Sequence, residues 1–208
     1  MPRRPLALGV DLAVKVSLVA LLVFALARPD LPQFHGKAIV GRAVAYPISA
    51  LVVPAVWWRL SRRRRIEYPY ALDVLIVLPF LIDTAGNAAN LYDTIGWWDD
   101  ANHFVNWGIL VAGFGQLLVR LPLGRVAVAA HAIGFGAVTA VLWEFLEYVT
   151  FIRNSSELDT AYTDTLGDLG LGLTGSVLAA IATTTVLWPA TRRQEADAPA
   201  GSGLPASP

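Results

Sequence analysis

The chain has 208 residues, of which 55% are hydrophobic and only 15% charged, a balance that is unusual for a soluble domain of this length. It contains no cysteine, which excludes disulfides, thiolate metal sites and cysteine nucleophiles. The sixteen Lys and Arg residues equal the sixteen Asp and Glu residues, so the net charge points to no particular partner.

Six apolar segments are long enough to cross a bilayer, whose hydrocarbon core of about 30 Å needs roughly 20 helical residues. They cover residues 6–27, 38–58, 69–88, 102–120, 126–150 and 165–188. In lipid every backbone amide needs a partner within the protein, and only helices and closed barrels provide one. These segments lack the alternation of barrel strands, so we expect helices. We predict an all-α, polytopic transmembrane helical bundle of about six helices at 1–190 and a disordered cytoplasmic tail at 191–208.

The first segment is too long for the apolar region of a signal peptide, and Asp11 and Lys15 interrupt it, so we expect a retained helix. The spacing of Asp11 and Lys15 favours a structural salt bridge, which Asp73 is placed to share.

The basic residues predict the orientation, because Lys and Arg concentrate on the cytoplasmic side. With both ends in the cytoplasm, twelve of the sixteen lie on the inner half. These are Arg3, Arg4, Lys15, Arg59, Arg62 to Arg65, Arg120, Arg125, Arg192 and Arg193. We therefore predict an N-in, C-in protein of the inner cell membrane, and interpret the run 62–65 as a topology signal rather than a nucleic-acid site.

Acidic residues gather at the opposite boundary, often at helical spacing. Three pairs share a helix face: Asp99 with His103, Glu144 with Glu147, and Asp164 with Asp168. Asp83 and Arg42 approach the same depth from two other helices, and Asp100 lies beside the first pair.

Ionisable groups inside a span cost several kcal/mol unless they are paired, hydrated or bound to an ion. Protonation, Arg42 or a bound cation would relieve the repulsion within such an acidic group. The candidate ligands, Asp99, His103, Glu144, Glu147, Asp164 and Asp168, suit a divalent Mg, Mn, Fe or Zn ion. The alternative is that these acids are simply hydrated near the interface, with Asp164 favouring the helix dipole.

The stretch from Asp93 to Ser176 resembles the YjdF-like bacterial inner-membrane proteins and, more distantly, the VanZ-like proteins. The likeness rests on three blocks, WDDANHF, LWEFLEY and TDTLGDLGLGLTG, which contain the three spaced pairs. The family tends to carry a further Asp where this chain has Ala161, and Asp159 is the nearby substitute. The resemblance implies an integral membrane protein with a polar outer site, and it implies no activity.

Three functions fit these features. The first is an enzyme acting on a lipid or lipid-linked substrate, with His103, Glu144 and Glu147 as catalytic groups and Arg42, Asp83 and Asp100 as substrate-binding groups. Its acid–base chemistry would run with or without a metal. The second is an ion- or proton-coupled transporter, and the third is a membrane interaction or scaffold protein. The pattern predicts no oligomeric state.

Overall fold

The computed structural model describes residues 3–63 and 66–196, and within them it is built from helices alone. Six helices are long: α1 (Arg3–Ala27), α2 (Ile39–Ser61), α3 (Tyr70–Ala88), α5 (Trp98–Leu118), α6 (Arg125–Thr150) and α7 (Ala161–Ala182). They lie at the six predicted segments, which confirms the all-α helical bundle. Of the predicted cytoplasmic cations, Arg64 and Arg65 lie outside the described residues.

Five segments of the described chain are long and apolar enough to cross a membrane: Pro5–Ala27, Ile39–Ser61, Tyr70–Ala88, Arg125–Asn154 and Ala161–Arg193. Helix α5 is the exception among the six long helices, since its first half carries Asp99, Asp100, Asn102 and His103. Large apolar side chains on the outer helices are exposed, among them Val16, Val44 and Phe145. Such a surface is expected where lipid rather than water surrounds the protein.

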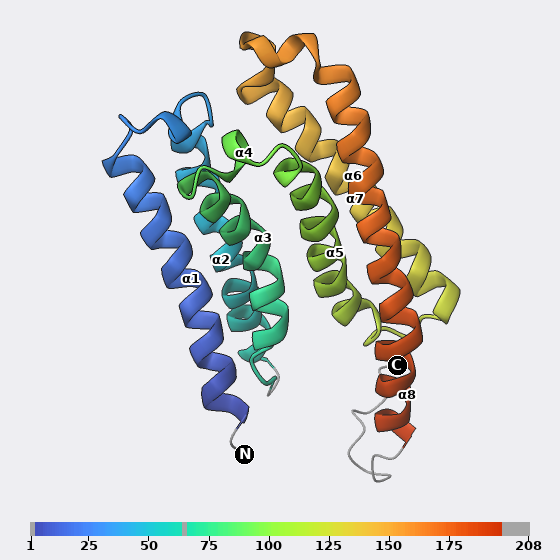
Figure 1. The fold of residues 1–208 in the computed structure, drawn as a ribbon. Coiled ribbons are helices and arrows are strands. Elements are labelled where there is room, and N and C mark those ends of the chain that lie inside the picture. The colour runs from blue at the N-terminus through green and yellow to red at the C-terminus, as the bar shows by residue number, and fades with distance from the viewer. Residues whose placement is uncertain (1–2, 64–65, 197–208) are drawn as a thin grey trace.

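The long helices form two groups of three (Figure 1). Helices α1, α2 and α3 pack together, as do α5, α6 and α7, and the contact between α3 and α5 joins the two groups. Helix α5 is central because α3, α6 and α7 all pack against it. A polar helix can therefore lie within the bundle without presenting its charges to lipid.

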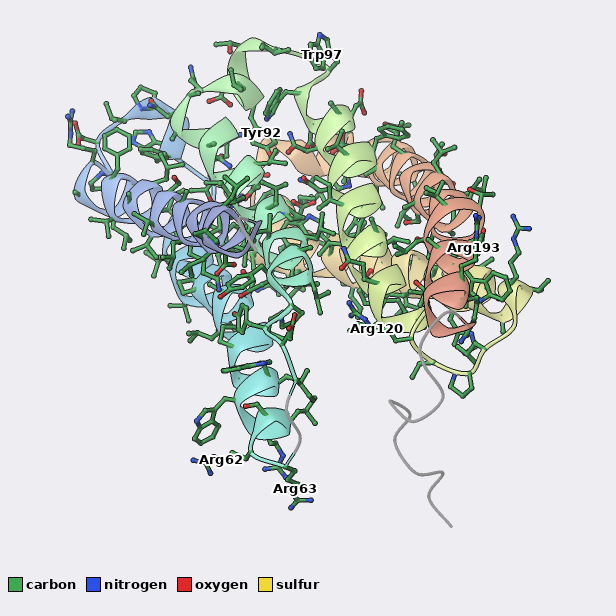
Figure 2. All side chains as sticks on the ribbon, turned by 90° about the horizontal axis from the view of Figure 1, so that it is seen from below. Arg62, Arg63, Tyr92, Trp97, Arg120 and Arg193 are labelled. Atoms are coloured by element: carbon green, nitrogen blue, oxygen red, sulfur yellow. The ribbon has the colours of Figure 1, made fainter. Side chains whose placement is uncertain are left out.

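The first described helix begins, and the last one ends, at the lower end of the bundle (Figure 1). Arg62 caps α2 at this end, Arg120 follows α5, and Arg193 lies in the last described helix, α8 (Trp188–Ala196) (Figure 2). This gathering of cations matches the predicted cytoplasmic side. That this end faces the cytoplasm stays a prediction.

Short elements close the opposite, upper end. They are η1 (Pro32–Phe34), α4 (Leu91–Thr94), η2 (Ile152–Asn154) and η3 (Ser156–Asp159). At the lower end a π-helical stretch, η4 (Thr183–Leu187), connects α7 to α8. Helix α8 extends to Ala196, six residues into the tail that was predicted to be disordered from 191, and residues 197–208 lie outside the described residues.

Helices α5 and α7 approach each other closely because their contact is made of glycines. A Cβ at Gly175 would collide with the carbonyl oxygen of Phe104, and one at Gly172 would collide with the Trp107 ring. Small residues allow such backbone contact in membrane bundles. The contact sets the separation of the two helices within about one turn of His103 on α5 and one to two turns from Asp168 on α7.

The predicted salt bridge in the lower half is present and includes all three residues. Lys15 Nζ lies 3.2 Å from Asp11 Oδ2 and also pairs with Asp73 Oδ2, to which the Tyr68 hydroxyl donates a hydrogen bond. Asp11 and Asp73 are both buried. The ammonium group thus compensates two carboxylates inside the span between α1 and α3.

Candidate functional site

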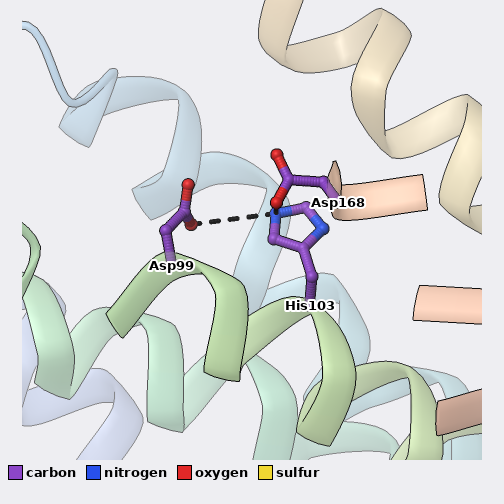
Figure 3. A group of neighbouring side chains, drawn as sticks. All are labelled: Asp99, His103 and Asp168. Atoms are coloured by element: carbon purple, nitrogen blue, oxygen red, sulfur yellow. Dashed lines mark ion pairs between the residues drawn. The ribbon is translucent and has the colours of Figure 1, made fainter. Parts of the chain in front are cut away.

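His103 is buried on α5 and faces carboxylates from three helices. Its Nε2 atom lies 3.7 Å from Asp99 Oδ1, one turn earlier on α5, and 3.8 Å from Asp168 Oδ1 of α7 (Figure 3). Its Nδ1 atom lies 3.6 Å from Glu144 Oε1 of α6. Asp168 and Glu144 are buried like His103, whereas the side chain of Asp99 is half-exposed.

These separations are too long for hydrogen bonds, which join such atoms at about 2.7–3.2 Å. They fit donors that share a cation, because two atoms each bonded at about 2.1 Å to one metal lie at most about 4.2 Å apart. One donor atom each from Asp99, His103 and Asp168 lies within 4.8 Å of the others. A small movement of the half-exposed Asp99 side chain would bring all three to bonding distance.

A second set of donors lies on the other side of the imidazole. Donor atoms of His103, Glu144 and Glu147 are also within 4.8 Å of one another. Glu144 Oε2 accepts a hydrogen bond of 3.1 Å from the Thr165 hydroxyl on α7, which fixes that carboxylate. Glu147 is less buried than Glu144.

Arg42 and Asp83 form a separate ion pair at the same end of the bundle. Arg42 also donates to the Tyr46 hydroxyl at 3.1 Å and to the Lys37 carbonyl at 2.8 Å. The hydroxyls of Tyr46 and Tyr92 donate to the two oxygens of Asp83 at 2.6 and 2.7 Å. Burial and the neighbouring Asp83 charge raise the pKa of Tyr92 above its ordinary value, so this hydroxyl keeps its proton and remains a donor.

A cavity of about 440 Å³ connects the two polar groups. Asp83 and Tyr92 line one side of its polar end, and Asp99, His103 and Glu147 line the other. The remaining wall is mostly apolar side chains of α2, α3, α5 and α6. Its volume is in the range of small-molecule sites, about 300–1,000 Å³.

Two candidate residues lie apart from both sets of donors. Asp100 and Asp164 are exposed, and neither belongs to the groups around His103. Asp159, the substitute suggested by the resemblance, is exposed in η3. The structure therefore brings together Asp99, His103, Glu144, Glu147 and Asp168, and it joins Arg42 to Asp83.

Several polar residues of this region were not singled out from the sequence. Tyr46, Tyr92 and Thr165 hold the carboxylates, and Asn102 and Asn106 line the cavity. The asparagines could have been found from the sequence, since helical spacing places positions 102 and 106 on the same face as Asp99 and His103. No sequence pattern indicated Tyr92 and Thr165, because their partners lie on other helices.

Fold and side-chain arrangement define the class: a multi-pass helical membrane protein with a buried carboxylate–histidine cluster near one end. Residues 11–188 match the sequence model of a family described as predicted membrane protein (DUF2238), and the chain belongs to that family. No curated protein and no solved structure matches the chain.

Proposed function

We propose that the protein is a membrane enzyme that uses a divalent cation to act on the headgroup end of a lipid or lipid-linked substrate. The observation that carries this proposal is the position of His103 on the wall of the cavity, with its Nε2 atom 3.7 Å from Asp99 Oδ1 and 3.8 Å from Asp168 Oδ1. Hydrogen bonding does not account for that spacing, and a shared cation does.

Asp99, His103 and Asp168 are the ligands that fit best. Two carboxylates and one imidazole form an oxygen-rich set that suits Mg, Mn, Fe or Zn. Three protein ligands would leave coordination positions open, as in catalytic metal sites. Because Asp99 and His103 also line the cavity, those positions would be accessible to a substrate within it.

The neighbouring glutamates have different roles in this proposal. Glu144, fixed by Thr165, lies 3.6 Å from His103 Nδ1. When the cation is bound, this separation would close to a hydrogen bond from Nδ1–H to Glu144, which would keep Nε2 directed at the cation, a common second interaction of ligating histidines. Glu147 lines the cavity and would take a proton from attacking water. The cation itself would supply Lewis-acid polarisation of the scissile group.

The substrate class follows from the depth and chemistry of the cavity. Its polar end lies near one membrane boundary, where lipid headgroups lie, and the basic end of the bundle predicts that this boundary faces away from the cytoplasm. Asp99, His103, Glu144, Glu147 and Asp168 all come from the three blocks that resemble YjdF-like inner-membrane proteins. That resemblance supports the proposal that the membrane is the inner one.

Metal analysis of purified protein tests the proposal directly. We expect about one equivalent of a divalent metal in the wild type and its loss in Asp168→Asn, which keeps the shape and removes a ligand charge. Asp100→Asn is the matched control, because Asp100 is an exposed carboxylate one residue from Asp99. No metal in the wild type, before or after incubation with Mn²⁺ or Zn²⁺, would reject the proposal.

Ion- or proton-coupled transport is a second candidate, and the lower cluster favours it. Two buried carboxylates there share one Lys15, and within the described residues Asp11 Oδ1 and Asp73 Oδ1 have no hydrogen-bond partner. Intramembrane carboxylates with spare acceptor atoms often mark ion paths. Ion flux in proteoliposomes that Asp73→Asn abolishes would support this function over the first.

A further inference from the structure

The cavity is an elongated groove rather than a round pocket. Helix α2 contributes Ala45, Ile48, Ser49 and Val52, and α3 contributes Ile76, Pro79, Phe80 and Asp83. Each set follows the helical spacing of one face. The lining residues of α5 extend from Asp99 to Leu110, and those of α6 from Phe135 to Glu147.

The groove is as deep as one leaflet of a bilayer. Asp99 and Leu110 are eleven residues apart, which corresponds to about 16 Å of helix at 1.5 Å per residue. Half of a hydrocarbon core of about 30 Å is about 15 Å. The carboxylates lie at the boundary end of this length, and Leu110 lies at the end towards the middle of the bundle.

The groove opens sideways between α2 and α6. Ile48 and Val52 on α2 line it while 58% and 46% exposed, and Leu142 and Leu146 on α6 line it while 54% and 59% exposed. Leu110 on the central helix α5 is half-buried. The lips of the groove therefore face the lipid phase, while its floor is covered by the bundle.

The side chains of the groove change from polar to apolar along its length. Below His103, Asn106 contributes a side-chain oxygen that has no hydrogen-bond partner within the described part of the chain. That acceptor lies one turn from His103, where the junction between a headgroup and its chain would lie. The oxygen is buried, so a rotation of the Asn106 side chain would be needed to present it to a donor in the groove, such as a free glycerol hydroxyl.

We propose that one hydrocarbon chain of a single-chain lipid, of the lysophospholipid type, occupies this groove after entering between α2 and α6. Its headgroup lies at the polar end, against Asp99, His103 and Glu147. The inference deepens the proposed function and rests on it for the fate of the headgroup. Binding of the hydrocarbon chain depends only on the apolar groove.

Photocrosslinking in nanodiscs tests the inference. The probe is lysophosphatidylethanolamine with a diazirine at the end of its acyl chain, in discs of phosphatidylethanolamine and phosphatidylglycerol. We expect crosslinks on Leu110, the half-buried residue at the inner end of the groove, in addition to lipid-facing side chains. Crosslinks confined to outward-facing residues would overturn the inference.

Blocking variants sharpen the result. Leu142→Trp fills one lip and Ile48→Trp fills the other; either should lower crosslinking at Leu110 about tenfold, since displacing two methylene groups already costs that much affinity. Val138→Trp is the control, because Val138 is exposed one turn away on α6 and is not among the described lining residues. Equal crosslinking in all three variants would contradict the groove.

A second copy of the chain is the competing occupant of the opening. The chain has no cysteine, so Leu142→Cys provides a single thiol. Efficient disulfide-linked dimers at that position in membranes would overturn the lipid assignment. Asp168→Asn separates this inference from the proposed function: because Asp168 is not among the described lining residues, this variant should lose the metal and keep the crosslinks. Metal-loaded wild type without crosslinks on Leu110 would contradict the groove alone.

Discussion

The lower cluster of Asp11, Lys15 and Asp73 and the upper cluster around His103 both place carboxylates inside the bundle, but they are compensated differently. In the lower cluster the Lys15 ammonium lies in direct contact with both carboxylates. In the upper cluster Asp99, Glu144 and Asp168 lie 3.6–3.8 Å from the His103 imidazole, and within the described residues none of the three forms an ion pair with a Lys or Arg.

This difference separates two uses of buried charge. A charge that is paired by a side chain is a structural element, and removing one partner leaves the other uncompensated. A set of donors without such a partner is compensated by a proton or a cation that comes from outside the chain. The two clusters should therefore respond in opposite directions to the loss of a charge.

The largest effect is expected in the lower cluster. Lys15→Met should destabilise the protein by about 3–5 kcal/mol, because it leaves two buried carboxylates without their cation. Unfolding in mixed detergent micelles measures this loss. Combining it with Asp73→Asn should recover much of the stability, and an unaltered unfolding free energy in Lys15→Met would refute the structural role.

A bound cation should stabilise the upper cluster alone. At a hundredfold excess over its dissociation constant, Mn²⁺ should raise the unfolding free energy of the wild type by about 2.7 kcal/mol. Asp168→Asn should show no such gain, while Asp164→Asn should retain it because Asp164 is exposed outside the donor sets. Thermal unfolding with and without Mn²⁺ distinguishes these variants.

Neutralising a carboxylate should have the opposite sign in the upper cluster. In metal-free protein, Glu144→Gln is expected to stabilise the fold by about 1 kcal/mol, since it removes repulsion while keeping an acceptor for Thr165. The same unfolding measurement applies. Destabilisation comparable to that of Lys15→Met would mean that the two clusters are compensated in the same way.

Acid should remove the stabilisation by Mn²⁺. Ligands bind metal only when deprotonated, so protons compete with the cation for His103 and its carboxylates. The gain should decline as the pH falls, because protons displace the cation from its ligands. Titrating the Mn²⁺-dependent shift in unfolding temperature gives the profile; a flat profile would argue against His103 as a ligand.

The exposed pair of Arg28 and Asp30 should show the smallest effect. Hydrogen bonds of 3.0 and 3.1 Å from Arg28 lower the pKa of Asp30 below its ordinary value. The resulting stability is present above the ordinary pKa of Asp and is lost as the pH falls through the lowered one. Because both side chains are exposed and screened, Asp30→Asn should scarcely change the unfolding temperature at pH 7.

Helix positions were predictable because lipid imposes a length and a composition on each span. The pairing of Asp99 with His103 followed from spacing alone. The sequence could not show that Asp168 is buried while Asp164 is exposed, because both lie on one face of α7. The packing of α5 against α7 decides which of these two turns is covered. For Arg42 and Asp83 the sequence indicated a common depth but not their pairing, because the two residues lie on different helices.

Gly175 has a consequence for the ligands on either side of it. The distance between His103 and Asp168 depends on how closely α5 and α7 pack, and that closeness requires hydrogen where any other residue has a carbon. A variant with alanine at position 175 would keep every candidate ligand but would hold the donors of His103 and Asp168 further apart. A glycine that touches none of the candidate metal ligands thus sets the distance between two of them.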